Sequence, residues 1–599
     1  MIKFSILAIF FFSYTAQFFS QTWDWATNAG GTTSDKGTAI VTDADGYSYV
    51  TGYFNEAADF GPFNMPLIDE HSKEVFIAKL DPLGNYVWVQ RGSNHYDDRG
   101  LGICLDPSGN IYVTGTCWGG IIFGALNEYN SSSYTDQIFL LKLDTDGNFI
   151  WLRNAGNDYG DDHGHDVVSD ALGNIYVTGF VSDWSFGNQG PSIATFGSEI
   201  IDIEYGDSLG FVAKISPDGV WQWAHKFGGI DGERDNRIAI DNASNVYISG
   251  GFTGTKDFGT ATITSEGGVD IFIAKYASDG TFQYVKNTGS TLDDRANDIT
   301  VNSNNDIYVT GEFRDKVVFG TDTINNNGGS GGRDIFVSKM DINGNWKWAT
   351  KAGSNYGTDR GCGIIGNNKD NIFVTGQFKE DAKFGDSITL SATLPDSVQI
   401  FVAAIDTLGK WVWALQAGGQ DNDDRGNAIS ADTVCNLYVT GYYKQTPTFG
   451  TNTLPNYGAR DIFISKIQNS CYINDTVKKP DIIDSVIVDT IIVINPPTPP
   501  VLDSIIPLKL FIPNSFTPND DERNQTFKPS VSTSLELENY SLKIFNQWGE
   551  LIFESKDYKV GWDGTFGTTY VKNGVYSWTL EFDILKEHID KVGHVLMIR

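Results

Sequence analysis

Seven acid–base dipeptides recur along the sequence at a nearly constant spacing. Each precedes a Tyr-Val-Thr-Gly motif or a close variant, with the acid fourteen and the base thirteen residues before its aromatic residue. The pairs are Asp35-Lys36, Asp98-Arg99, Asp162-His163, Glu233-Arg234, Asp294-Arg295, Asp359-Arg360 and Asp424-Arg425. Because adjacent residues of an extended chain point to opposite sides, each pair is expected to serve two neighbouring repeats. The pattern predicts a structural acid–base ring, formed as ion pairs between repeats.

The same residues also permit a binding interpretation. They would form a polar collar around the mouth of a channel, where four further acids would offer a cation site: Asp97, Asp161, Asp293 and Asp423. His163 and His165, beside Asp166, are residue types that suit a metal ion. Since His163 only fills the base position of the repeat, we predict a structural role and no metal site.

The chain carries no sequence motif of catalysis. It has no nucleophile elbow, zinc-protease helix or phosphate-binding loop, so we predict no catalytic residue and no cofactor. Ca²⁺ is the alternative ligand of the close carboxylates in "DADG" (43–46) and "DTDG" (144–147). The same positions elsewhere read "DPSG", "SPDG" and "DING", which keeps turn chemistry but not carboxylate ligands. Hairpin turns are therefore predicted there.

The elements that position these residues are repeated seven times. The Tyr-Val-Thr-Gly motif or its variant begins at Tyr49, Tyr112, Tyr176, Tyr247, Tyr308, Phe373 and Tyr438, 61 to 71 residues apart. Each copy follows a short apolar segment and precedes a run related to "DIFIAK" at 270–275. Between them lies a Phe-Gly dipeptide, at Phe60, Phe123, Phe186, Phe258, Phe319, Phe384 and Phe449. Short runs rich in Val, Ile, Tyr and Phe and bounded by Gly, Asn or Asp are typical of strands.

A fourth run, which carries Trp or Tyr, follows only six of the motifs: Trp88, Trp151, Trp223, Tyr284, Trp348 and Trp413. The last unit lacks it, whereas an orphan copy precedes the first unit at Trp23 and Trp25. A four-stranded blade whose outer strand comes from the other end of the chain closes a propeller ring. We therefore predict an all-β fold, a seven-bladed β-propeller closed by an N-terminal strand. Over residues 22–467 the units resemble the bacterial β-propeller repeat family often called SBBP.

The loops of such a repeat fall into two groups. The first-to-second and third-to-fourth turns are short and uniform, whereas the second-to-third loops, on the opposite face, vary in length and content. Variable loops on a repeated scaffold are where binding sites are usually built. Any ligand surface is therefore expected on the face of the second-to-third and fourth-to-first loops.

The remaining segments differ from the repeats. Residues 1–20 have the charged, apolar and small-residue regions of a signal peptide, with cleavage expected between Ala16 and Gln21. The propeller is assigned to 21–470, and 471–507 form a linker rich in Pro, Ile, Val and Asp. The most apolar stretch of this linker, 482–494, is too short to span a bilayer and contains two aspartates, so no membrane span is predicted.

The charge and the cysteine content of the chain limit its expected binding partners and its disulfides. The 43 basic and 75 acidic residues give a formal net charge of −32, which excludes nucleic acid as an expected partner. Cys435 and Cys471 replace turn glycines of the last unit at two strand ends that antiparallel pairing brings together, so a disulfide is predicted between them. The other three cysteines, Cys104, Cys117 and Cys362, are expected to be buried and reduced.

Residues 508–599 are predicted to form a small β-sandwich. They contain "PNSFTPN" (513–519), "IFNQWGELIFES" (544–555), "GWDGT" (561–565) and the terminal "GHVLMIR" (593–599). This segment resembles the gliding motility-associated C-terminal domain, the type B sorting signal of the type IX secretion system of Bacteroidota. The resemblance assigns the sorting motif to Trp548, Gly549, Trp562, Asp563, Gly564, Gly593 and Arg599. It implies the type IX secretion machinery as a partner and passage through the periplasm to the cell surface or medium.

Together these features predict an exported, monomeric surface or secreted protein whose propeller binds a surface glycan or protein and has no chemistry of its own. The alternative is an extracellular polysaccharide-active enzyme that uses carboxylates on the variable face. The two differ in what that face contains: convergent acids in a deep cleft for an enzyme, exposed aromatic and polar loops for a binding module.

Overall fold

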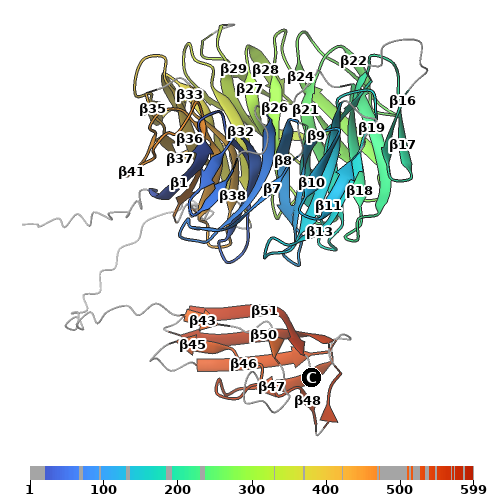
Figure 1. Cartoon of the computed structure of the whole chain (residues 1–599). Coiled ribbons are helices and arrows are strands. Elements are labelled where there is room, and N and C mark those ends of the chain that lie inside the picture. The colour runs from blue at the N-terminus through green and yellow to red at the C-terminus, as the bar shows by residue number, and fades with distance from the viewer. Residues whose placement is uncertain are drawn as a thin grey trace, which may run out of the picture. The chain divides into compact units, whose positions relative to one another are not determined.

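The computed structural model describes residues 21–468 and 471, apart from gaps at 67–71, 94–95, 130–134, 184–191, 230–235, 329–330, 368–370 and 421–422. Of the C-terminal part it describes 509–597, apart from 512–514, 517–525, 533–537, 547–549, 568, 573 and 585–586. The predicted signal peptide and most of the predicted linker lie outside these residues. The regular elements are β-strands, which confirms the all-β prediction (Figure 1). Contacts divide the chain into two compact units, Met1–Lys478 and Lys479–Arg599.

The described part of the first unit contains seven antiparallel sets of four strands, one for each repeat; five are separate sheets and a hairpin extends the other two to six strands. The first strands are β2 (Lys36–Thr42), β8 (Asp98–Leu105), β14 (His163–Ser169), β20 (Arg237–Ile240), β26 (Arg295–Val301), β32 (Arg360–Gly366) and β38 (Arg425–Ala431). The second strands carry the Tyr-Val-Thr-Gly motif: β3 (Ser48–Asn55), β9 (Ile111–Trp118), β15 (Ile175–Ser182), β21 (Val246–Phe252), β27 (Ile307–Phe313), β33 (Ile372–Lys379) and β39 (Leu437–Tyr443).

The third strands carry the "DIFIAK" runs: β6 (Lys73–Leu80), β12 (Asp136–Leu143), β18 (Ser208–Ile215), β24 (Asp270–Tyr276), β30 (Asp334–Met340), β36 (Val398–Ile405) and β42 (Asp461–Ile467). The fourth strands are β7 (Tyr86–Gly92), β13 (Phe149–Ala155), β19 (Trp221–Gly229), β25 (Phe282–Thr288), β31 (Trp346–Gly353) and β37 (Trp411–Ala417). The sheet of the last repeat takes its fourth strand from β1 (Trp23–Gly31), at the other end of the unit.

Strand β1 pairs antiparallel with β42, with Ala29 opposite Ile462 and Trp25 opposite Lys466. Trp23 at its start is 7% exposed, and its ring lies 5.1 Å from that of Phe449. The indole N–H of Trp23 donates to the carbonyl of Gln416 in the preceding repeat, at 3.1 Å. The orphan tryptophan run therefore completes the sheet of the last repeat and also contacts its neighbour.

A two-stranded hairpin between the second and third strands of each repeat was not predicted from the sequence. The hairpins are β4 (Ala58–Phe60) with β5 (Phe63–Met65), β10 (Gly120–Phe123) with β11 (Leu126–Tyr129), β16 (Ser192–Phe196) with β17 (Glu199–Ile203), β22 (Thr255–Asp257) with β23 (Thr262–Thr264), β28 (Lys316–Phe319) with β29 (Asp322–Asn325), β34 (Asp381–Phe384) with β35 (Ile388–Ser391) and β40 (Thr448–Phe449) with β41 (Asn452–Thr453).

The Phe-Gly dipeptide forms the turn of this hairpin. In the fifth repeat Gly320 has φ +63, a left-handed conformation that favours glycine, and Phe319 packs 5.3 Å from Phe336 of the third strand. In the third repeat Phe196, and not the Phe186 assigned to the repeat pattern from the sequence, takes this place, 4.9 Å from Phe211. The longer loop of that repeat contains two Phe-Gly dipeptides, and Phe186 of the other one lies outside the described residues.

The core of the first unit lies between neighbouring sheets. Each apolar cluster draws side chains from two consecutive repeats, and one cluster joins the last repeat to the first, with Ile462 and Ile464 packed against Val50 and Phe76. The first strands contact one another in the same order, including β38 with β2. Within the described residues, the sheet of the last repeat therefore packs against that of the first, as consecutive sheets pack against each other.

The structure agrees with the sequence-based predictions for the hairpin turns and for the cysteines. The carboxylate of Asp144 in "DTDG" accepts the amide N–H groups of Asp146 and Asn148 at 3.0 and 2.8 Å, as in a hairpin turn. Its pKa lies below the usual range because these donors, together with the side chain of Asn148, outweigh its slight burial. Cys435 and Cys471 form a disulfide with their Cα atoms 5.4 Å apart, and the other three cysteines are buried.

The second unit is built on a five-stranded sheet in the order β44 (Ser515–Phe516), β51 (Glu587–Met597), β50 (Gly574–Ile584), β46 (Glu538–Phe545) and β47 (Leu551–Ser555). Two small sheets accompany it, β43 (Lys509–Phe511) with β45 (Ser530–Ser532) and β48 (Thr565–Phe566) with β49 (Thr569–Tyr570).

The "GWDGT" segment anchors the core of this unit. Trp562 is fully buried, its backbone pairs with Phe527, and its indole N–H donates to the carbonyl of Thr565 at 2.8 Å. Asp563 accepts the amide of Thr565 at 3.0 Å across the turn at Gly564, whose φ is +80. Gly593 lies opposite Trp578 in the sheet, whereas Trp548, Gly549 and Arg599 lie outside the described residues.

We expect the last sheet to depend on its strand from the other end of the unit. Deleting residues 22–30 from the exported protein removes β1 and exposes the edge of β42, and loss of the Trp23 side chain alone costs about 3–5 kcal/mol. Calorimetry should show a lower and broader unfolding transition, with more aggregation, and Trp23→Ala should fall between this variant and the parent. A deletion variant that melts as sharply and at the same temperature as the parent would contradict this role of β1.

Candidate functional site

The predicted bases stand at the beginning of the first strands. Lys36, His163, Arg295, Arg360 and Arg425 open their strands, Arg99 is the second residue of β8, and Glu233-Arg234 lies outside the described residues. The motif glycine fixes each of them, because a Cβ on Gly52, Gly115, Gly179, Gly311, Gly376 or Gly441 would lie only 1.8–2.0 Å from the backbone oxygen of its base. The Tyr-Val-Thr-Gly motif thus holds the base in place through close backbone packing.

A glycine follows five of the seven bases and allows a close approach to the neighbouring repeat. A Cβ on Gly361 would lie 2.1 Å from the hydroxyl oxygen of Thr310, the motif threonine of the preceding repeat, and the same contact recurs at Gly37, Gly100, Gly164 and Gly426. The threonine hydroxyl itself donates to the carbonyl of Phe336 at 2.9 Å. At these five junctions a side chain in place of the glycine would clash with that threonine, whereas Ala296 follows the base Arg295 in the fifth repeat.

The predicted acids have a different role from the one expected. The carboxylate of Asp359 accepts the amide of Ser354 at 2.6 Å and that of Lys379 at 2.7 Å, so it joins the loop before its strand to the end of the second strand. The amide twenty residues later is bonded in the same way by Asp35, Asp98, Asp162, Asp294 and Asp424.

The predicted ion pairs within the dipeptide set are therefore wrong for Asp35, Asp162, Asp294 and Asp359. These carboxylates are fully buried, and a buried backbone amide at a strand end needs an acceptor, which the carboxylate supplies. The bases find partners elsewhere: Arg99 with Asp97 at 3.4 Å, His163 with Asp136 at 3.0 Å, and Arg295 with Asp293 at 3.3 Å.

Some bases have aromatic or sulfur partners instead. The ammonium of Lys36 lies 4.7 Å from the ring of Tyr442, and Nε of Arg425 donates to the sulfur of Cys362 at 3.2 Å. Burial, and then the positive charges of Arg460 and Arg425, lower the pKa of Lys36 to about 8. The rim thus brings cationic groups close to one another.

The four additional acids do not form the cation site considered from the sequence. Asp97 pairs with Lys73 and Arg99, Asp293 with Arg295, and Asp423 with Arg460 at 2.5 Å. Asp161 accepts the amide of Asp136 at 3.4 Å. Three of the four negative charges are therefore balanced by side chains of the protein.

Sequence reasoning missed these partners because it followed only the dipeptides. Lys73, Asp136, Arg333 and Arg460 all occupy one repeat position, three residues before the phenylalanine of the third strand. Val269 and Val398 stand there in two other repeats. Aligning the repeats for charged residues at this position would have identified them.

A cavity of about 980 Å³ opens beside His163. Its walls come from three consecutive repeats, and they include a loop of the third repeat (Glu204 to Leu209) and the hairpin of the fourth (Thr255 to Gly259). Five acids line it, namely Asp136, Asp161, Glu204, Asp207 and Asp257, together with Arg99, Lys226 and Lys256. Phe180 and Phe227 supply apolar surface. It therefore lies on the face where variable loops were expected to form a ligand surface.

The two histidines are held in this wall by packing and hydrogen bonds. The ring of His163 lies 4.6 Å from that of Phe180, and buried His165 accepts the amide of Asn236 on Nδ1 at 3.2 Å. An acceptor at Nδ1 leaves the proton of a neutral ring on Nε2. Among the described residues no three His, Cys, Asp or Glu side chains are grouped so as to hold a metal ion.

A second set of carboxylates is shared between neighbouring repeats. Asp334 begins the third strand, and a Cβ on Gly353 would lie 2.4 Å from its Oδ1 and 3.0 Å from Oδ2 of Asp359. Burial raises the pKa of Asp334 to about 7, and the negative charge of Asp359 acts in the same direction. The hydrogen bond from the amide of Asn327 lowers this pKa but does not outweigh the two effects. Burial likewise raises the pKa of Asp359 to about 6 and that of Asp35 to about 7.

The fold and the site define an all-β repeat protein with a cavity lined by loops and strands of three consecutive repeats. Comparison with known families gives two matches: residues 412–442 match the family described as "Beta-propeller repeat" (SBBP), and residues 510–597 match "CHU_C Type IX secretion signal domain". The chain thus contains a segment similar to a propeller repeat and ends in a type IX secretion signal domain, and this signal indicates export to the cell surface or the medium. No helix among the described residues is long and apolar enough to cross a membrane.

More distant likenesses concern parts of other proteins. The chain is 23% identical over 441 residues to "Uncharacterized WD repeat-containing protein L264" of Acanthamoeba polyphaga mimivirus, which covers 60% of this chain but only 31% of that protein. A puromycin hydrolase mutant (9% identity, TM-score 0.36) covers 71% of this chain and 54% of its own. PorZ of Porphyromonas gingivalis (9% identity, TM-score 0.19) covers 96% and 100%. At these TM-scores the likenesses define no activity.

The shared carboxylates predict a pH dependence of stability. Because the pKa of Asp334 is raised from 3.8 to about 7, the folded protein binds its proton more tightly than the unfolded chain, and stability is lost as the pH rises through 7. Asp334→Asn, which stays neutral, should lose less stability between pH 5 and pH 8 than the wild type, by on the order of 1–3 kcal/mol. Thermal unfolding at the two pH values measures this.

The repeat supplies a matched control. Gln399 occupies the position of Asp334 in the next repeat, and its amide donates to the carbonyl of Gly419 at 2.7 Å. Gln399→Glu should therefore have the opposite effect, with a steeper loss of stability toward pH 8. Equal pH slopes in the wild type and both variants would show that these carboxyl groups are ionised throughout.

Proposed function

We propose that this protein is a surface or secreted binding protein whose seven sheets close into a seven-bladed propeller. Three features support the ring: each repeat gives one four-stranded sheet, β1 completes the last sheet, and an apolar cluster joins the last repeat to the first. In this arrangement residues 21–470 form the propeller, 1–20 the signal peptide, 471–507 the linker and 508–599 the sorting domain.

The cavity carries the proposal of ligand binding. It is built from loops that differ between repeats, and it offers apolar rings beside charged groups of both signs, as pockets that recognise polar ligands commonly do. The ligand is a glycan or a protein of the cell's surroundings, which fits the location set by the secretion signal.

A polysaccharide-active enzyme is the second candidate, because five acids line the cavity. Of the lining carboxylates, Asp136 is paired with His163 at 3.0 Å. The strongly raised carboxyl pKa values belong to buried residues that bind backbone amides beneath the surface, such as Asp35 and Asp359. The acids with raised pKa values are thus separate from the acids that line the cavity, and this favours a binding site over a catalytic site.

A lysine pair tests the role of the cavity. Lys226 lines it and donates to the carbonyl of Asp202, while Lys351 occupies the same repeat position outside the cavity lining and contacts Asn325 in the same way. In a screen of the exported protein against glycans and surface proteins, Lys226→Ala should weaken ligand binding by about tenfold, and Lys351→Ala should leave it unchanged. Equal binding by both variants would exclude the cavity, and hydrolysis of a bound glycan would favour the enzyme.

The secretion signal makes a separate prediction about export. Removing residues 508–599 should leave the protein in the periplasm, and a signal peptide, a foreign protein and residues 472–599 in one chain should reach the surface or medium. Trp562→Ala should act like the truncation, because losing this core side chain costs about 3–5 kcal/mol in a small domain. Fractionation with immunoblotting measures each outcome. Normal surface levels of the truncated protein would contradict the sorting role.

A further inference from the structure

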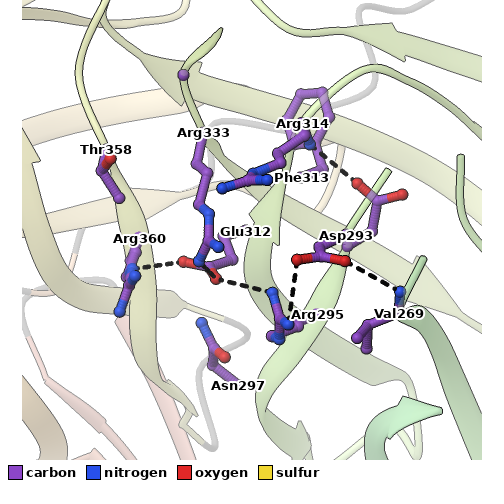
Figure 2. Close-up of polar contacts among 12 residues, drawn as sticks. Val269, Asp293, Arg295, Asn297, Glu312, Phe313, Arg314, Arg333, Thr358 and Arg360 are labelled. Carbon is purple, nitrogen blue, oxygen red and sulfur yellow. Dashed lines mark hydrogen bonds and ion pairs between the residues drawn. The ribbon is translucent and has the colours of Figure 1, made fainter. Parts of the chain in front are cut away.

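Four arginines gather around one glutamate where two repeats meet at the rim (Figure 2). Glu312 lies near the end of β27, and Arg295 opens β26 of the same repeat. Arg360 opens β32 of the next repeat, with its Nε 2.6 Å from Oε2 of Glu312. Arg333 is bonded to Oε1 of Glu312, and Nη1 of Arg295 lies 3.7 Å from that oxygen. Arg314 extends toward Arg333 from beyond the end of β27.

The cluster has more positive than negative charge. In the described part of the chain, Glu312 and Asp293 are the acids that pair with these arginines. Four guanidinium groups and two carboxylates leave an excess of two positive charges, in a chain whose net charge is −32. Arg295 is only 8% exposed, and Glu312 is 2% exposed. Burial and the charges of Arg360, Arg314 and Arg295 lower the pKa of Arg333. Grouping like charges away from water costs free energy unless a counter-ion joins them.

Several donors of these arginines have no acceptor in the described structure. The Nε atoms of Arg295 and Arg314 are shielded from solvent and make no hydrogen bond, and neither does Nη1 of Arg295. A guanidinium presents its N–H groups in a rigid planar fork that fits the oxygens of a carboxylate, sulfate or phosphate. The missing partner of this cluster is therefore an acceptor with several negatively charged oxygens.

The repeat shows that the missing counter-charge is particular to this site. Lys73 occupies the position of Arg333 in the first repeat and is paired with Asp97 of the next repeat. In the repeat that follows Arg333, the sixth, the residue at the position of Asp97 is Thr358, which forms a backbone bridge with Arg333 and carries no charge. At the position of Glu312 the other repeats have no acid. Compared with the first repeat, this site has Thr358 in place of an aspartate. It has Glu312 as an additional acid, but three arginines share that carboxylate.

We propose that Arg295, Arg314, Arg333 and Arg360 bind an oxyanionic group of a ligand at the rim of the propeller. None of the four lines the cavity, so this site goes beyond the proposed function and stands or falls separately. A long polyanion is repelled by the acidic surface of the protein. The ligand is therefore one with an isolated anionic group, and the shared chemistry of its carboxylate, sulfate or phosphate is what the arginines recognise.

The test uses the full exported protein and three probes at constant ionic strength. Galacturonic acid and inorganic sulfate carry the oxyanion, and galactose is the neutral counterpart of the first probe. Titration calorimetry should show binding of both anions to the wild type and none of galactose. Thermal unfolding should shift upward with anion concentration, since a ligand of the folded state stabilises it.

Matched variants locate the site. Arg333→Gln and, separately, Arg314→Gln should weaken anion binding by at least about tenfold, whereas Lys73→Gln, at the position of Arg333 in the first repeat, should bind like the wild type. Circular dichroism confirms that each variant is folded, and two arginine variants guard against the failure of one. Absence of anion binding to the wild type, or equal binding by all three variants, would overturn the proposal. Binding of sulfate alone would assign the site to a free inorganic anion, and binding of galacturonate would assign it to an acidic sugar.

Discussion

The arrangement of most repeats depends on a close approach between a glycine and a threonine of the preceding repeat, which a larger side chain in place of these glycines would prevent. At the junctions the glycine after the base lies against the threonine hydroxyl of the preceding repeat, where a Cβ would come within 2.1–2.4 Å of that oxygen. The motif glycine of the same repeat lies against the backbone of the base in the same manner. Two glycines therefore fix the spacing of consecutive first strands and the place of each base. The apolar clusters between the sheets can form because this spacing is constant.

The repeated part of this fold was predictable from the sequence because each strand is short, apolar and bounded by turn residues. The orphan strand at Trp23 was predictable by counting, since one repeat lacked a tryptophan run that the chain carried elsewhere. The hairpins were not, because two or three residues around a Phe-Gly dipeptide have no periodicity to detect. The third repeat shows the same limit, because its long loop contains two Phe-Gly dipeptides that cannot be told apart in the sequence. The structure shows that Phe196, and not Phe186, packs against Phe211.

The positions of the site residues were predictable, but their partners were not. Spacing placed an acid and a base at every junction, and charge complementarity then suggested an ion pair. The structure gives the acid to backbone amides instead, as the bonds of Asp359 to Ser354 and Lys379 show. The sequence does not show which backbone amides lack a hydrogen-bond acceptor, because every residue except proline has the same amide group. Glu312 and Arg333 were within reach of the sequence, because both are departures from the residues found at their repeat positions.

This use of the acids determines the electrostatics of the rim. Because the buried acids bind backbone amides, as Asp359 does, the charge of a neighbouring lysine or arginine has to be balanced by other groups. Where a repeat also places Asp97 or Asp423 nearby, the positive charge of an arginine is balanced within the protein. Where it places Thr358, the balance fails, and Arg295, Arg314, Arg333 and Arg360 share too few acids. An overall acidic protein thereby acquires a local cationic surface, and the repeat that builds the fold also produces it.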